Sequence, residues 1–164
     1  MDIKETEWIK KFVDYLQNER RFSGHTVSNY SRDLNKIVSF CKAKQIDAWA
    51  AMSVHDVRAY ISQRHRRGLS GRSLQRELST LRSFFKFLER ENVVTKSPTT
   101  GVTAPKTPRK LPQVLDVDQV SRLLNMQTNE ILAIRDKAMI ELMYSSGLRL
   151  SELVSLNLGD IDLK

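Results

Sequence analysis

The sequence predicts an all-α protein that is divided into two parts. Apolar residues recur every three or four positions through most of the chain, which is the period of an amphipathic helix. Residues 1–96 contain no stretch that alternates with the period of two expected for a strand. All four prolines fall between positions 98 and 112, and they separate the two parts.

Residues 1–96 are expected to form a four-helix domain. The four apolar faces lie in residues 8–16, 27–41, 53–61 and 70–88. Ser53 followed three residues later by Asp56 is typical of a helix start, and the fourth helix is expected to begin near Ser70. Residues 97–113 combine the prolines with Gly101 and several threonines, which predicts an extended linker.

Residues 114–164 are expected to begin a second, mainly α domain. Asp116 and Gln119 have the spacing that caps a helix, and a longer helix is expected at about 129–146. That helix is apolar almost all round at Ala138–Tyr144, so it is expected to lie in the middle of a core. Gly147 should end it as a left-handed cap, and a short helix is expected at 151–156. Residues 160–163 are a candidate for the start of a strand, because polar and apolar residues alternate there.

The charge of the chain differs between the two parts. Residues 1–110 contain 22 Lys and Arg and 11 Asp and Glu, a balance of +11. Residues 111–164 contain 5 and 8, a balance of −3. This step predicts a polyanionic partner for the first part, with nucleic acid favoured over an acidic protein surface.

The basic residues of the second and fourth helices are ordered into two stripes, each opposite an apolar face. The stripe of the second helix is His25, Ser28, Asn29, Arg32, Lys36 and Ser39, and that of the fourth is Arg72, Arg76, Ser79, Ser83, Lys86 and Arg90. Cations that bind phosphates are mixed here with short side chains that reach base edges. We therefore predict that these stripes bind duplex DNA through His25, Thr26, Asn29, Arg32, Lys36, Arg72, Arg76, Ser83 and Lys86.

Other kinds of site have little support. The histidines and the single cysteine lack the spacing of metal ligands, and no glycine-rich phosphate loop is present, so no metal and no cofactor are expected. No small-molecule substrate is expected either. No segment has the length and apolarity of a membrane span, and no leading signal segment is present. With one cysteine, these features predict a cytoplasmic protein.

The run Gly147–Glu152 places one arginine at a sharp turn into a short helix. Arg149 stands there with a rigid approach, helix amides nearby, and Glu152 close enough to orient its guanidinium. This arrangement suits an arginine that binds a phosphate.

Together these segments resemble the front portion of a tyrosine recombinase of the phage integrase family. The residues that carry the resemblance are Ser23–Val27 with Tyr30, Asp33 and Leu34, the linker segments Ala104–Lys106 and Arg109–Pro112, and the run Gly147–Leu153. The resemblance implies a SAM-like core-binding domain at 1–96, a linker at 97–113, and the start of a catalytic domain at 114–164, here incomplete.

The resemblance also implies a chemistry. Family members cut DNA with a tyrosine that becomes joined to a 3′-phosphate, and they exchange strands as tetramers without a metal or cofactor. Arg149 would bind the scissile phosphate, and Glu152 would orient Arg149. Some members act with a related recombinase to resolve chromosome dimers before cell division.

Several family residues have no counterpart within positions 1–164. These are the β-hairpin lysine, the His-x-x-Arg motif and the nucleophilic tyrosine, so the chain is expected to bind DNA without cleaving it. Two alternatives remain open. One is a non-enzymatic regulator that uses the turn Arg67–Ser70 in a helix-turn-helix, and the other is a natural truncated inhibitor of an intact recombinase.

Overall fold

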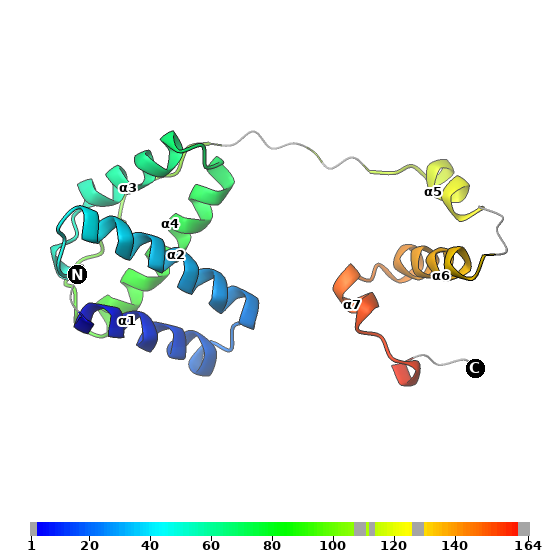
Figure 1. Cartoon of the computed structure of the whole chain (residues 1–164), viewed down its shortest axis with the longest axis horizontal. Helices are drawn as coiled ribbons and strands as arrows, with labels where there is room; N and C mark the ends of the chain where they lie inside the picture. The colour runs from blue at the N-terminus through cyan, green and yellow to red at the C-terminus, as the bar shows by residue number, and fades with distance from the viewer. Residues whose placement is uncertain (1–2, 107–110, 112–113, 126–129, 161–164) are drawn as a thin grey trace. The chain divides into compact units, whose positions relative to one another are not determined.

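All regular secondary structure in the described part of the chain is helical. The computed structural model describes residues 3–106, 111, 114–125 and 130–160, with side chains for all of these except 3–5 and 158. No strand occurs in these ranges, which confirms the predicted all-α class. The chain divides into two compact units, Met1–Arg109 and Lys110–Lys164 (Figure 1).

The first unit is built on four α-helices, and serine caps set the starts of three of them, α2, α3 and α4. Its elements are α1 (Ile3–Asp14), a π-helical turn (Tyr15–Glu19), α2 (Gly24–Ala43), a 3₁₀ turn (Trp49–Ala51), α3 (Val54–Arg66) and α4 (Gly71–Arg90). The Ser23, Ser53 and Ser70 hydroxyls each accept a hydrogen bond from the backbone N–H three residues later. These bonds satisfy amides that have no partner inside a helix, so Ser53 and Ser70 begin α3 and α4 as predicted.

An aromatic core holds the four helices together. Phe12, Trp49 and Phe84 are fully buried, and the ring centroids of Trp49 and Phe84 lie 4.8 Å apart in an edge-to-face arrangement. Phe12 lies 5.2 Å from Phe84 in a similar arrangement. Cys41 belongs to the same core, and burial raises the pKa of its thiol to about 11. Because all four helices contribute to this core, the outer faces of α2 and α4 are held in a fixed relation.

The first half of the predicted linker packs against the first unit. Val102 is only 2% exposed, and Arg82 Nη2 donates to the Val102 carbonyl oxygen at 2.6 Å. The Ser97 N–H donates to Glu89 Oε1 at 2.8 Å. Residues 97–105 are therefore fixed on the four-helix domain rather than extended away from it.

The described part of the second unit consists of three α-helices and a 3₁₀ turn. They are α5 (Val117–Leu124), α6 (Ile131–Ser146), α7 (Leu150–Val154) and a 3₁₀ turn (Leu158–Asp160). Asp116 and Gln119 form a reciprocal capping box. The Gln119 N–H donates to Asp116 Oδ1 at 2.7 Å, and the Asp116 N–H donates to Gln119 Oε1 at 3.0 Å. Gly147 has φ of +65°, the left-handed conformation predicted for it, and it ends α6.

Burial in the second unit differs from the expectation for α6. None of the described residues of α6 is buried, although a place at the centre of a core was predicted for this helix. The described part of the unit buries only Val120 and Leu153 among its large apolar side chains. Within the described ranges, α5 and α7 leave Ile131, Leu132 and Ile134 of α6 exposed. Residues 161–163 of the predicted strand lie outside the described residues.

Candidate nucleic-acid interface

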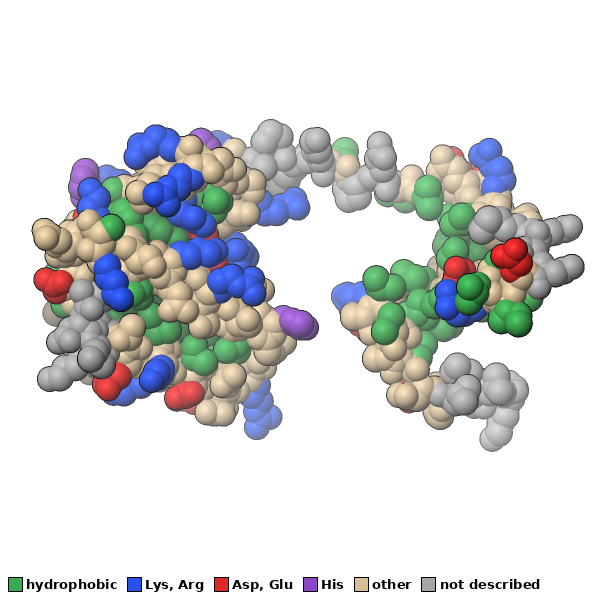
Figure 2. Space-filling model, viewed as in Figure 1, with side chains coloured by type: hydrophobic (Ala, Val, Ile, Leu, Met, Phe, Trp, Pro, Cys, Tyr) green, Lys and Arg blue, Asp and Glu red, His purple; other side chains and the backbone are tan. Residues whose placement is uncertain are grey.

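The nine side chains predicted to bind DNA lie on two helices that pack together. Those from α2 are His25, Thr26, Asn29, Arg32 and Lys36, and those from α4 are Arg72, Arg76, Ser83 and Lys86. All of them are exposed or partly exposed, and the apolar faces of the two helices point into the core. Figure 2 shows Lys and Arg side chains gathered over these helices, and we call these nine residues the basic surface.

Local hydrogen bonds orient the polar side chains at the start of α2. The Ser23 hydroxyl caps the helix at the Thr26 N–H and also lies 2.9 Å from the Thr26 hydroxyl. One turn further on, Arg32 Nη1 donates to Asn29 Oδ1 at 3.4 Å. Hydroxyl, amide and guanidinium groups therefore lie side by side on this face. Such a mixture suits a surface that contacts phosphates and base edges.

Ion pairs join the α2 and α4 stripes at their middle. Lys36 Nζ lies 2.9 Å from Asp33 Oδ1 and 3.1 Å from Glu77 Oε1, so it bridges a carboxylate from each helix. Arg76 Nη1 lies 2.8 Å from Asp33 Oδ2, an ion pair without hydrogen-bond geometry. Asp33 and Glu77 are fully buried, whereas Lys36 and Arg76 keep 32% and 46% of their side chains exposed.

Glu77 also binds α3 to this network. Arg64 donates to both of its oxygens, at 2.8 and 3.2 Å, and the Tyr60 hydroxyl donates to Oε2 at 2.8 Å. Burial by itself would raise the pKa of Glu77, but hydrogen bonds from Arg64, Tyr60 and Lys36 outweigh it and leave this pKa below its usual value. Burial, together with the Glu77 charge, raises the pKa of Tyr60, so the hydroxyl stays protonated and keeps donating.

The sequence did not indicate these two buried acids as functional. The helical period places Glu77 off the basic stripe of the fourth helix, and Asp33 stands only among the residues that carry the family resemblance. A signal was present, because Glu77 falls within the apolar arc of α4, between Leu74 and Leu78. A carboxylate in such a position needs cationic partners, and the stripe of the neighbouring helix supplies one in Lys36.

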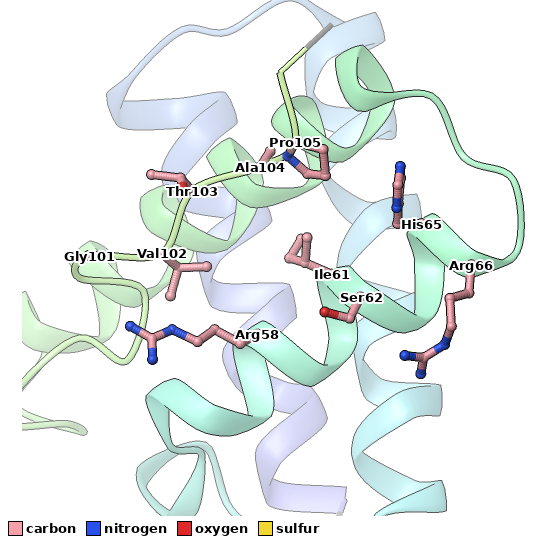
Figure 3. Close-up of a pocket in the computed structure, with 10 residues that line it drawn as sticks. All are labelled: Arg58, Ile61, Ser62, His65, Arg66, Gly101, Val102, Thr103, Ala104 and Pro105. Carbon is pink, nitrogen blue, oxygen red and sulfur yellow. The ribbon is translucent and has the colours of Figure 1, made fainter.

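A hollow with basic side chains lies between α3 and the segment 101–105. It measures about 670 Å³, and Arg58, His65 and Arg66 stand along its α3 wall (Figure 3). The turn that follows α3 contains Gly68 at φ of +85° and leads directly into α4, so the turn named in the helix-turn-helix alternative connects two helices. The nine residues of the basic surface do not line this hollow.

Arg149 and Glu152 are in contact at the start of α7. Arg149 Nη1 lies 2.9 Å from Glu152 Oε1, and the Arg149 N–H donates to Glu152 Oε2 at 2.8 Å. The Arg149 side chain is 81% exposed, so most of its guanidinium faces solvent. One carboxylate thus fixes both the backbone and the side chain of an arginine that still has free donors. The roles in catalysis that the sequence suggested for both residues stay predictions.

Within the ranges that the structure describes, no group of three or more His, Cys, Asp or Glu is placed to hold a metal ion. No helix in those ranges is long and apolar enough to cross a membrane.

The chain matches two family models in succession. Residues 9–92 match the phage integrase N-terminal SAM-like domain, and residues 113–164 match the phage integrase family. The chain belongs to the phage integrase family. This confirms the resemblance inferred from the sequence, and it places the basic surface inside the integrase SAM-like domain.

Curated family members with high similarity carry the name tyrosine recombinase XerC. The chain is 46% identical over 157 residues to the protein of Alcanivorax borkumensis, covering 94% of this chain and 50% of that protein. It is 46% identical over 156 residues to that of Azotobacter vinelandii, covering 94% and 52%. It is 42% identical over 157 residues to that of Pseudomonas syringae, covering 95% and 52%. The chain therefore spans about half the length of the curated relatives that it matches.

Proposed function

We propose that these 164 residues are the DNA-holding portion of a site-specific tyrosine recombinase of the XerC type. The observation that carries the proposal is the basic surface, in which two helices place their cationic stripes side by side within the integrase SAM-like domain. Cations hold the backbone of the duplex there, while Thr26, Asn29 and Ser83 reach base edges or phosphates.

Arg149 supplies the first element of catalysis in this proposal. Its exposed guanidinium binds the non-bridging oxygens of the scissile phosphate and stabilises the charge that develops during phosphoryl transfer. Glu152 holds it in place at 2.9 Å. In the recombinase reaction a tyrosine hydroxyl attacks the phosphorus, a 3′-phosphotyrosine forms, and the 5′-hydroxyl leaves. No tyrosine within these 164 residues matches that nucleophile, so we propose that they bind duplex DNA without cleaving it.

The partners follow from the same assignment. We propose a recombinase tetramer on two DNA sites, in which a related recombinase of the XerD type occupies the neighbouring positions, and chromosome dimers as the natural substrate. Because that substrate is chromosomal DNA, the place of action is the cytoplasm.

Charge reversal on the basic surface tests the binding assignment. Arg72 and Lys86 suit this test because, among the described residues, neither forms an ion pair whose loss would disturb the fold. The double change Arg72→Glu and Lys86→Glu should abolish the mobility shift of a labelled 30-bp duplex at about 0.1 M salt, because four units of charge are lost at the phosphate backbone. Lys10→Glu with Lys42→Glu is the matched control, since it changes the net charge equally at exposed positions outside both stripes.

Equal loss of binding in both double variants would mean that net charge alone drives binding, and the assigned surface would be wrong. A suicide duplex with a nick next to the cleavage position tests the second claim. We expect no covalent protein–DNA adduct in denaturing gels, and accumulation of an adduct would overturn the assignment of binding without cleavage.

A further inference from the structure

We propose that Asp33 and Glu77 are positioning residues that hold Lys36 and Arg76 in place on the basic surface and restrain them from binding arbitrary phosphates. The two acids would thereby raise discrimination between DNA sequences and lower affinity for unrelated DNA. This inference rests on the proposed function, because it assumes that the basic surface binds DNA.

The first support is the position of the acids beneath the surface. Both carboxylates are fully buried, and all four of their oxygens lie within 3.2 Å of a cation or a hydroxyl donor. A buried carboxylate that is paired in this way keeps its partners, because separating them leaves an unpaired charge in the core. Lys36 and Arg76 are therefore tethered from below while their outer parts reach solvent.

The second support is the contrast along the fourth helix. Arg72, Arg76 and Lys86 share one stripe, but of these three only Arg76 has an ion-pair partner among the described residues. Arg72 and Lys86 are therefore free to follow any phosphate. Asp33 and Glu77 compensate part of the charge of Arg76, Lys36 and the third cation, Arg64. Arg76 and Lys36 therefore add less to the general attraction of the duplex and more to a fixed pattern of hydrogen-bond donors.

A purely structural role for the acids predicts something different. In that case Asp33 and Glu77 only tie α2 to α4, and removing one of them lowers thermal stability without changing how binding depends on salt. The number of phosphates contacted sets that dependence, with a change of about 0.9 in the slope of log K against log salt for each contact. The slope therefore separates the two roles.

The test uses four chains, one further control variant and two duplexes. The chains are the unmodified protein, Asp33→Asn, Arg76→Gln and the double variant. The duplexes are a 30-bp sequence enriched from a randomised library by the unmodified protein and a scrambled version of it, each measured by fluorescence anisotropy over a salt series. Glu7→Gln is the matched control, because it removes the same charge from an exposed position on α1.

Asp33→Asn should steepen the salt slope on the scrambled duplex by about 0.9 and reduce the preference for the enriched duplex at least about fivefold. In the Arg76→Gln background these effects should shrink by at least half, since one of the two restrained cations is gone. The slope and preference of Glu7→Gln should equal those of the unmodified protein. An Asp33→Asn slope and preference equal to the unmodified values would overturn the proposal, and so would effects that persist in full in the double variant.

Two further outcomes keep the test decisive. If Asp33→Asn does not fold, Arg76→Gln and Arg72→Gln are compared instead. Arg76→Gln should flatten the slope by less than half as much as Arg72→Gln, and equal flattening would overturn the proposal. If the unmodified protein binds neither duplex, the proposed function fails, whereas binding with an unchanged Asp33→Asn slope defeats only this inference.

Discussion

The two units of the chain use apolar residues in opposite ways. In the first unit Phe12, Trp49 and Phe84 are fully buried in a core to which every α-helix contributes. In the second unit Ile131 is 83% exposed and Val154 75% exposed, although both belong to helices. The first unit is therefore held by tertiary packing, whereas the described part of the second buries few large apolar side chains, Val120 and Leu153.

This difference explains why the candidate nucleic-acid interface is better defined in the first unit. The positions of the α2 and α4 stripes depend on a dense core below them, which fixes side chains that are far apart in sequence. The Arg149–Glu152 pair is fixed by local geometry alone, because both residues belong to one turn of chain. Long-range order thus supports the basic surface, and short-range order supports the predicted phosphate-binding arginine.

The largest expected effect is the loss of a core aromatic from the first unit. Phe84→Ala should lower the free energy of unfolding by about 3–5 kcal/mol, because it leaves a cavity against Phe12 and Trp49. Both tryptophans of the chain, Trp8 and Trp49, lie in the first unit, so urea unfolding followed by tryptophan fluorescence reports on that unit. Ile131→Ala in the second unit should leave this transition unchanged, and a comparable shift would contradict the contrast between the units.

The next effect tests the buried acid on α4. Glu77→Gln should lower the free energy of unfolding of the first unit by about 1–3 kcal/mol near neutral pH, because it weakens the bonds from Lys36, Arg64 and Tyr60. The pKa of Glu77 is lower in the folded protein than its ordinary value, so its ionised form adds stability above the unfolded pKa. That contribution is lost as the pH falls through the folded pKa.

The difference in stability between the unmodified protein and Glu77→Gln should therefore shrink as the pH falls below about 4.5, the ordinary pKa of the carboxyl group. Thermal unfolding followed by tryptophan fluorescence at several pH values measures it. The exposed substitution Glu7→Gln should show no such loss at any pH. A difference that grows as the pH falls would show that Glu77 is not stabilised in its ionised form.

A smaller effect is expected at the end of α6. Gly147→Ala should destabilise the helix end by about 1 kcal/mol, because φ of +65° strains any residue with a Cβ. Faster hydrogen exchange of the α6 amides would measure this loss. Gly24→Ala is the matched control, since Gly24 lies in the first turn of α2 and a Cβ there meets no atom within 4 Å. Equal changes in hydrogen exchange at both sites would contradict the claim that Gly147 is needed for its left-handed conformation.

Features set by nearby residues could be predicted from the sequence. Ser53, Ser70 and the pair Asp116–Gln119 begin helices where expected, and Gly147 takes the left-handed cap, because each depends on residues within one turn. The helical period likewise placed the two basic stripes on outer faces.

Features set by distant residues could not be predicted in the same way. That Lys36 would reach Glu77, 41 positions away, depends on how α2 crosses α4, which no periodicity contains. The packing of Val102 beneath Arg82 likewise followed from the fold rather than from the proline-rich composition that predicted a linker. Exposure of α6 also differed from the prediction, because periodicity reports how apolar a helix is and not what packs against it.

The salt dependence of DNA binding tests most directly whether the basic surface of the first unit holds the duplex. The double substitution Arg72→Gln and Lys86→Gln should flatten the slope of log K against log salt by about 1.8, because it removes two phosphate contacts that contribute about 0.9 each. The double substitution Arg122→Gln and Lys137→Gln in the second unit should leave this slope unchanged. Equal flattening by both pairs, or flattening only by the second, would contradict the assignment of DNA binding to α2 and α4.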